Sequence, residues 1–367
     1  MSDKQMLRRV LGIFLPLAMA LLLVRLAIGL CAPPEQTFSI VTWKQTHGPS
    51  GGKINALLLD EHHPGVIYAA TDGGVYVSQD GGNLWKYTSR NLPAGQEITT
   101  LAMAQTPTQI IYAGTYNGVY HSTDGGQTWV PATTGLANSP VFSLAVDPEN
   151  STTAYAGTDQ QIFKSLDGGS TWTVSSEGLP EGMIWALAID HISPNILYAG
   201  TDAGVFKSID YGMHWQRAGT NMPDRLRVQG LAIDPVVPSI LYAATEAGVY
   251  RSNDGATTWQ VAAGGIGEMI IHALAIDPNN PRTLYAAVGT QGVWQSTNSG
   301  ETWAPVSGNL NELVLALAIH PSHSQIMYAG TGRGVYYTST GGQRWEPRNE
   351  GLLSTNVLLL VAVPERP

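Results

Sequence analysis

Residues 122–129, Ser122-Thr-Asp-Gly-Gly-Gln-Thr-Trp129, form a phrase that occurs in seven versions along this chain of 367 residues. The versions end in tryptophans at Trp85, Trp129, Trp172, Trp215, Trp259, Trp303 and Trp345. Successive tryptophans are separated by 44, 43, 43, 44, 44 and 42 residues. A period of this length is typical of one four-stranded unit repeated around a ring or along a stack.

The third repeat shows the expected strands of one unit. Residues 141–147 are an apolar run that ends at an Asp-Pro turn, and residues 154–157, 161–165 and 172–175 are short β-prone stretches. Tight turns between them predict four antiparallel strands. The first stretch is the most apolar, so we expect it to be the innermost strand and to be buried on both faces.

The recurring phrase joins the third and the outer strand, and each of its residue types has a structural explanation. The Asp can accept hydrogen bonds from turn N–H groups, and the glycines permit positive φ. The Trp is expected to fill the space beside the next unit. We therefore assign these residues a structural role and no catalytic one. They are Asp80, Trp85, Asp124, Trp129, Asp167, Trp172, Asp210, Trp215, Asp254, Trp259, Trp303 and Trp345.

Four-stranded units repeated radially predict an all-β fold, a seven-bladed β-propeller of antiparallel blades. The chain ends complicate the count. Residues 39–43 match an outer strand without its phrase, and residues 356–363 match an inner strand without the rest of a blade. Either the termini overlap to close a seven-bladed ring, which we favour, or there is an eighth, incomplete blade.

The sequence resembles the Asp-box (BNR) repeat propellers over nearly all of residues 38–363. Three Asp boxes match strongly and the others drift, with Tyr211 or Ala256 at glycine positions and Asn298 or Thr340 at the Asp position. Two branches are most similar. The photosystem II stability/assembly factor group implies an exported or lumenal scaffold without catalysis, and the sialidase and xyloglucanase-like group implies a glycosidase. The sortilin type has a larger ring and a cysteine-rich module, and this chain has one cysteine.

Glycosidase chemistry requires residues that do not stand out here. A xyloglucanase-like site needs two carboxylates across an open cleft. The aspartates that recur after the innermost strands follow the needs of the turn, as the Asp-Pro pairs at Asp147, Asp234 and Asp277 indicate. The arginine arrangement of a sialidase and the short nucleotide-binding and hydrolase motifs are absent. We predict no catalytic residue, with a glycoside hydrolase as the alternative.

Function should be sought where the repeats differ. The second residue of the innermost strand varies in every blade, while its neighbours hardly change. It should lie near the loops between second and third strands and the loops between successive blades, which we call the loop face. Loops on a rigid scaffold often carry function. The predicted binding residues are Asp72, Tyr116, Phe142, Asp159, Trp185, Asp202, Gln229, Glu246, His272 and Arg333. Phe142 and Trp185 could instead only pack between blades.

The N-terminus is a separate element. Lys4, Arg8 and Arg9 precede an apolar run over residues 10–32 that only Arg25 interrupts. A helix over these 23 residues could span a bilayer about 30 Å thick. Positive charge before the run predicts that the N-terminus stays in the cytoplasm and the rest is exported.

We expect residues 1–32 to be an uncleaved membrane anchor, one hydrophobic helix, with a cleaved signal peptide as the alternative. Residues 28–31, Ile-Gly-Leu-Cys, resemble a lipoprotein box only loosely. Residues 33–37 are then a short linker and residues 38–367 the propeller. The protein is expected to be exported, and either anchored in the cell membrane with the propeller outside the cytoplasm or secreted.

Charge limits the class of partner. The chain has 19 Lys+Arg and 28 Asp+Glu, and residues 1–32 hold four of the basic and one of the acidic residues, so the remainder carries a net charge of −12. So acidic a body disfavours nucleic acid. We predict a monomer that binds a protein or peptide, with a glycan as the alternative, and that holds no cofactor and no metal. A purely structural repeat protein would show no concentrated aromatic or charged patch on either face.

Overall fold

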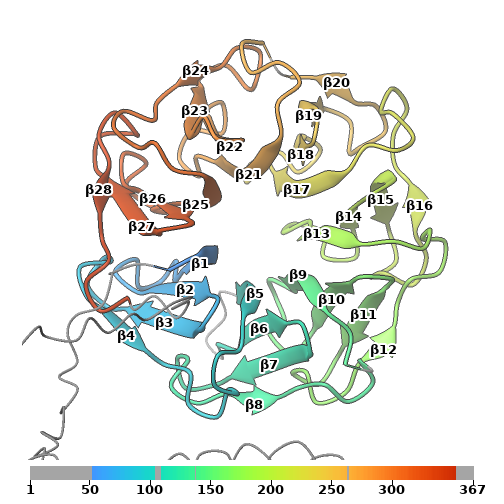
Figure 1. Cartoon of the computed structure of the whole chain (residues 1–367). Coiled ribbons are helices and arrows are strands. Elements are labelled where there is room, and N and C mark those ends of the chain that lie inside the picture. The colour runs from blue at the N-terminus through green and yellow to red at the C-terminus, as the bar shows by residue number, and fades with distance from the viewer. Residues whose placement is uncertain (1–51, 104–108, 137, 263, 353–367) are drawn as a thin grey trace, which may run out of the picture. The chain divides into compact units, whose positions relative to one another are not determined.

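The computed structural model describes residues 52–103, 109–136, 138–262 and 264–352. These residues form seven four-stranded antiparallel sheets, each made of four consecutive strands. Figure 1 shows the sheets as blades around a centre. The all-β, seven-bladed prediction is confirmed for this part of the chain. The expected N-terminal helix, the domain boundaries and the two unpaired end strands lie outside the described residues.

The innermost strands run side by side around the central channel, each contacting the innermost strand of the next blade (Figure 1). They are β1 (Ile54–Leu59), β5 (Ile98–Met103), β9 (Val141–Val146), β13 (Ile184–Ile189), β17 (Val228–Ile233), β21 (Ile271–Ile276) and β25 (Val314–Ile319). The second strands are β2 (Ile67–Thr71), β6 (Ile111–Thr115), β10 (Ala154–Thr158), β14 (Leu197–Thr201), β18 (Leu241–Thr245), β22 (Leu284–Val288) and β26 (Met327–Thr331).

The third and outer strands complete each blade. The third strands are β3 (Gly74–Ser78), β7 (Gly118–Ser122), β11 (Ile162–Ser165), β15 (Gly204–Ser208), β19 (Gly248–Ser252), β23 (Val293–Ser296) and β27 (Gly334–Thr338). The outer strands are β4 (Trp85–Tyr87), β8 (Val130–Pro131), β12 (Thr173–Val174), β16 (Gln216–Arg217), β20 (Gln260–Val261), β24 (Ala304–Pro305) and β28 (Glu346–Pro347).

Burial corrects one expectation. The second strands are buried at every position, whereas the innermost strands are only partly buried. The innermost strand borders the channel, and its neighbours are other blades and not a covering layer. Its apolar sequence therefore reflects packing against adjacent blades, and the second strand, with a blade on each side, forms the core.

The Asp-box tryptophans join neighbouring blades. The indole N–H of Trp129 donates to Thr88 O at 2.8 Å, and that of Trp172 donates to Ala132 O at 2.8 Å. Each tryptophan thus packs against the preceding blade, and the expectation that it fills the space beside the next blade is wrong. The reason is the path of the chain. After its outer strand, each blade continues into a loop, and the tryptophan of the next blade packs on that loop.

The same contacts close the ring. The backbone N–H of Trp85 donates to Glu350 O at 2.8 Å, and its indole N–H donates to Arg348 O at 2.8 Å. Strand β1 also contacts β25 and β26. The first described blade therefore meets the seventh directly, which excludes an open stack for residues 52–352. Within the described residues no helix is long and apolar enough to cross a membrane.

A second interblade contact escaped the sequence analysis. Every second strand carries a tyrosine, and these side chains are almost fully buried. The hydroxyl of Tyr112 donates to Ser151 O at 2.8 Å, and that of Tyr155 donates to Tyr211 O at 3.0 Å, both in the following blade. Burial raises the pKa of these phenols, that of Tyr68 to about 12. The tyrosines are Tyr68, Tyr112, Tyr155, Tyr198, Tyr242, Tyr285 and Tyr328.

Candidate functional site

A β-bulge stands at the start of every innermost strand. In β13, Ile184 pairs with Thr201 and Ala186 pairs with Gly200, so Trp185 has no partner. The same irregularity recurs in the other six blades. The unpaired residues are Asn55, Thr99, Phe142, Trp185, Gln229, His272 and Leu315. We call them the bulge ring.

The bulge ring is the position that varies between repeats. A bulged residue is freed from the ladder and its side chain is re-aimed, a feature common near functional sites. All seven bulge-ring residues are half-buried. The variability has a physical reason, because no cross-strand partner constrains the side chain there.

Three aromatic side chains from successive blades form a row at this level. Tyr116, in the loop after β6, packs edge-on against Phe142, with ring centroids 6.2 Å apart and an interplanar angle of 83°. Phe142 in turn contacts Trp185, with centroids 5.4 Å apart. The guanidinium carbon of Arg227 lies 5.2 Å from the centre of the Trp185 ring. We call Tyr116, Phe142, Trp185 and Arg227 the aromatic row.

Asp202 fixes one end of the aromatic row. Its Oδ1 accepts hydrogen bonds from Trp185 Nε1 at 2.9 Å and from Arg227 Nε at 3.0 Å. Partial burial by itself would raise the pKa of Asp202, but the hydrogen bonds from Trp185, Arg227 and the Met183 backbone outweigh it, and the pKa lies below the ordinary value. The carboxylate is therefore charged near neutral pH and holds both neighbours in place.

The structure brings together four of the predicted binding residues, Tyr116, Phe142, Trp185 and Asp202. Glu246 joins them indirectly, because its Oε1 accepts a 3.4 Å hydrogen bond from the backbone N–H of Arg227.

The other predicted residues lie apart from these contacts. Arg333 pairs with Glu312 at 3.4 Å, on the seventh blade. Gln229 is half-buried on β17, the innermost strand after β13. His272 is on β21, and burial lowers its pKa. Asp72 and Asp159 are half-exposed in loops of the first and third blades. The predicted acidic rim is thus partly neutralised, since Asp202 already pairs with a guanidinium.

Arg227 was missed from sequence. It precedes β17 by one residue, a place where the first two blades carry Lys53 and Glu97. Those two also meet across a blade boundary, with Lys53 Nζ 3.1 Å from Glu97 Oε1. A charged residue directly before an innermost strand was the available signal, and its partner could not be inferred without the ring.

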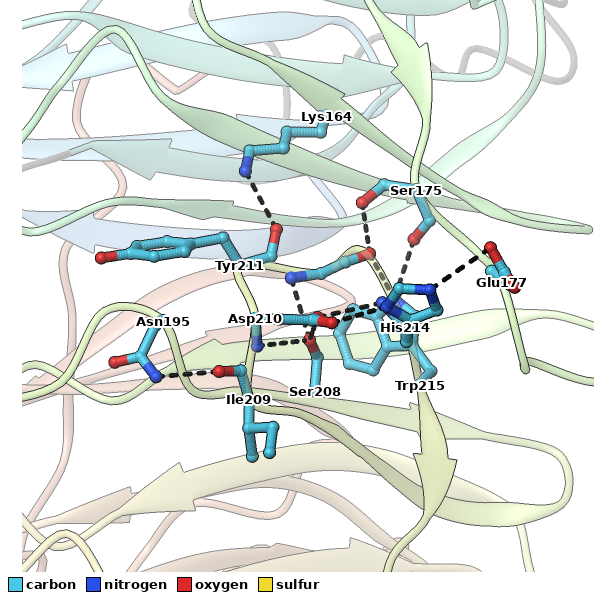
Figure 2. Close-up of polar contacts among 11 residues, drawn as sticks. Lys164, Ser175, Glu177, Asn195, Ser208, Ile209, Asp210, Tyr211, His214 and Trp215 are labelled. Atoms are coloured by element: carbon cyan, nitrogen blue, oxygen red, sulfur yellow. Dashed lines mark hydrogen bonds and ion pairs between the residues drawn. The ribbon is translucent and has the colours of Figure 1, made fainter.

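The Asp boxes form hydrogen-bonded turns between the third and the outer strands. In the fourth box Ser208 Oγ donates to Asp210 Oδ1 at 2.8 Å. Oδ1 of Asp210 also accepts a hydrogen bond from the His214 backbone N–H at 3.0 Å (Figure 2). The Trp215 indole donates to Ser175 O at 2.8 Å. The hydrogen bonds that Asp210 accepts from the backbone N–H and the side chain of His214, and from Ser208, lower its pKa to about 2. Asp210 is a turn acceptor, and it also lines a cavity of about 550 Å³ together with Lys207, His214 and Arg217.

The fourth box departs from the common Ser-x-Asp-Gly-Gly-x-Thr-Trp pattern at two positions. Tyr211 holds φ of 59° where a glycine is usual. His214 replaces the threonine, and its ring lies between Asp210 Oδ2 at 2.6 Å and Glu177 Oε2 at 3.6 Å (Figure 2). The hydrogen bond to Asp210 and the charge of Glu177 raise the pKa of His214. Glu177 follows the outer strand of the third blade, so its contact with His214 joins the third and fourth blades at an exposed edge.

The opposite mouth of the channel is apolar. A cavity of about 700 Å³ there is lined from all seven blades, with leucines and isoleucines of the innermost strands and prolines of the following turns. Glu61 and His191 are its only charged or titratable lining residues among those described. Within the described chain no three His, Cys, Asp or Glu side chains are grouped so that they could hold a metal ion.

The arrangement also bears on catalysis. A glycosidase of the retaining or inverting type needs a carboxylic acid with a raised pKa next to a second carboxylate. Asp202, the carboxylate in contact with the aromatic row, has a lowered pKa and two cationic or N–H partners. Asp202 is therefore an ionised hydrogen-bond acceptor for Trp185 and Arg227.

Comparison with known proteins places the fold among Asp-box propellers. A profile of the Sortilin-Vps10 family (Sortilin, neurotensin receptor 3) matches residues 247–357. The GH74 xyloglucanase from Xanthomonas campestris superposes with a TM-score of 0.69 and 20% identity, over 84% of this chain and 56% of that one. The chain thus spans about half the length of the GH74 structures it matches. No curated protein matches the sequence.

A second group of structures matches along its whole length. YCF48 from Cyanidioschyzon merolae superposes with a TM-score of 0.59 and 16% identity, over 80% of this chain and 96% of that one. A structure of YCF48 bound to D1 peptide gives a TM-score of 0.60 and 15% identity, over 81% and 95%. At sequence identities this low, the structural matches establish the fold alone. The chain is a seven-bladed β-propeller of the Asp-box (BNR) type, structurally similar to YCF48 and GH74 xyloglucanases and similar in sequence to the sortilin Vps10 domain.

Proposed function

We propose that this chain is a non-catalytic, extracytoplasmic scaffold that binds a protein or peptide on its loop face. The aromatic row carries the proposal. Aromatic and arginine side chains held rigidly at the mouth of a scaffold are the residues that dominate the free energy of protein recognition. A purely structural repeat protein has no need for such a row.

The held geometry favours recognition of a partner. Asp202 and Phe142 fix Trp185 from two sides, so little side-chain freedom remains to be lost on binding. Tyr116 is 45% exposed and Arg227 is exposed as well, so both ends of the row are accessible. By analogy with the YCF48 structure that holds the D1 peptide, the partner is a peptide segment.

The N-terminal segment completes the proposal. Residues 10–32 would hold the propeller at a membrane, with the loop face outside the cytoplasm. The propeller would then act as a monomeric receptor for a neighbouring protein.

Binding can be tested with the purified full chain on an array of unrelated peptides. We expect a subset of peptides to bind, and Trp185→Ala and Phe142→Ala to reduce their affinity about tenfold or more each. Leu315→Ala changes another bulge-ring residue, away from the row, and serves as the matched control. Binding that persists unchanged in both aromatic variants would overturn the proposal.

A second function is a carbohydrate-binding or glycoside hydrolase propeller, favoured by the same aromatic row and by the GH74 likeness. This function predicts that the protein binds or cleaves xyloglucan oligosaccharides. It also predicts that mutation of a pair of carboxylates abolishes the cleavage. Oligosaccharide binding that is lost in Trp185→Ala, with no peptide bound, would establish this alternative in place of the first.

A further inference from the structure

The loop face contains two carboxylates in equivalent positions and different surroundings. Thr201 pairs with Ile184, so Asp202 follows the pair beside the bulge residue Trp185. Thr158 pairs with Val141, so Asp159 follows the corresponding pair beside Phe142. Asp159 therefore has the same register position relative to Phe142 as Asp202 has relative to Trp185.

The two bulge residues differ in what they offer the carboxylate. Trp185 donates its indole N–H to Asp202, and Arg227 gives that carboxylate a cation. Phe142 has no donor. The carboxylate of Asp159 thus lacks the indole hydrogen bond that its counterpart has, and Asp159 is half-exposed.

Two aromatic residues, Phe142 and Tyr116, belong to the same part of the loop face as this second carboxylate. Tyr116 occupies the same loop position in the preceding blade, directly after Thr115, which pairs with Ile98. Its ring meets that of Phe142 nearly at a right angle, 83°, with Tyr116 45% exposed. Two perpendicular aromatic rings, with a carboxylate-bearing residue directly after the pair of Thr158 and Val141, provide the groups that attract a cation, through the ring faces and through the charge.

The surrounding loops have the same sign of charge. The loops of the loop face from residue 116 to residue 270 carry seven carboxylates and two guanidinium groups. The carboxylates are Asp159, Glu177, Glu181, Asp202, Asp224, Glu246 and Glu268, and the guanidinium groups are those of Arg225 and Arg227. Asp224 is also paired with Arg217 at 3.2 Å, and Glu177 lies 3.6 Å from His214. The remaining excess of carboxylates raises the local concentration of cationic ligands and repels acidic ones.

We propose that the site formed by Tyr116, Phe142 and Asp159 binds a cationic side chain, arginine or lysine, of a basic peptide segment. The inference rests on the proposed function and specifies its partner. The stem of the cationic side chain packs on Phe142 and Tyr116, and its head pairs with Asp159. Arg227 is already stacked and paired, so it is part of the wall and not a competitor for an acidic ligand.

The test uses the full chain and four synthetic peptides that differ only at their centre: Gly-Ser-Gly-Phe-Xaa-Phe-Gly-Ser-Gly with arginine, lysine, citrulline or glutamate at Xaa. Citrulline keeps the shape of arginine and removes its charge. We expect the arginine and lysine peptides to bind about tenfold or more tightly than the citrulline peptide, and the glutamate peptide to bind most weakly.

Variants assign the effect to the site. Asp159→Asn should reduce the affinity for the arginine peptide about tenfold and leave that for the citrulline peptide nearly unchanged. Asp72→Asn alters the equivalent loop carboxylate of the first blade, where the bulge residue is Asn55, and should leave both affinities unchanged. Equal melting temperatures of the two variants will show that both are folded.

The outcomes separate the two proposals. Arginine and citrulline peptides that bind equally, with binding lost in Phe142→Ala, would overturn the cation site and leave peptide binding intact. A glutamate peptide that binds best would overturn it in favour of an anionic partner. Binding of these peptides and of the array peptides that is absent, or is unchanged in both Phe142→Ala and Trp185→Ala, would overturn both.

Discussion

The indole N–H of Trp185 lies 2.9 Å from Oδ1 of Asp202, and this hydrogen bond joins a β-bulge residue to the loop that follows the next strand. Because Arg227 reaches the same oxygen from the following blade, one carboxylate holds a tryptophan and a guanidinium in contact. The aromatic row is therefore held in place by hydrogen bonds and ring contacts within the chain.

Removing this carboxylate should loosen the row. Asp202→Ala leaves a half-buried indole N–H and a guanidinium without their acceptor, so we expect the free energy of unfolding to fall by about 1 kcal/mol and peptide affinity to fall with it. Asp159→Ala, at the equivalent position beside Phe142, should change the free energy of unfolding by less than about 0.5 kcal/mol. Urea denaturation of both variants measures the difference, and equal losses would contradict it.

The Asp-box tryptophans should dominate stability. Trp129 is fully buried against the first blade, and its indole donates to Thr88 O. We expect Trp129→Ala to lower the free energy of unfolding by about 3–5 kcal/mol. Val130, the next residue, is 50% exposed, and Val130→Ala should cost less than about 0.5 kcal/mol. A tryptophan variant as stable as the valine variant would show that the interblade contact is dispensable.

One drifted box should gain stability from its consensus residue. Ser299 has φ of 60°, in the left-handed region where a side chain is strained. We expect Ser299→Gly to raise the free energy of unfolding by about 0.5–1 kcal/mol. Ser170 lies in the third box without positive φ, so Ser170→Gly should destabilise by a similar amount. Thermal melts of the pair will check the opposite signs.

The Asp boxes should make stability depend on acid. The hydrogen bonds from the side chain and the backbone N–H of Thr258 lower the pKa of Asp254 to about 2, below its ordinary value of 3.8. A depressed native pKa stabilises the fold above pH 3.8, and that contribution is lost as the pH falls towards 2.

Asp254→Asn removes this titration. Asn298 already occupies the equivalent position in the sixth box, accepting from the Thr302 backbone N–H at 3.0 Å, so the turn tolerates an amide. The melting temperature of the variant should be close to that of the natural protein at pH 7 and should fall less between pH 4 and pH 2. Parallel curves over this range would show that Asp254 does not contribute.

The repeated phrase was sufficient to predict the blades because each box is a local structure. Asp124 accepts from a backbone N–H only four residues along, and the glycines between them supply the positive φ of the turn. Such contacts are encoded within eight residues, and the period between boxes sets the number of strands. The same reasoning could not say that Trp129 packs on the preceding blade, since that depends on how blades are joined.

The contacts of the candidate site could be predicted only in part, for a related reason. Comparison of the repeats identified Phe142 and Trp185 as residues freed from the common pattern, but it contains no information on the direction of their side chains. Arg227 is 42 residues from Trp185 along the chain, and only the closed ring brings the two within 5.2 Å. The sequence by itself determined the unit, its number and the positions free to vary. The tertiary structure decided which of those positions meet, because circular packing brings residues one repeat apart into contact at the channel mouth.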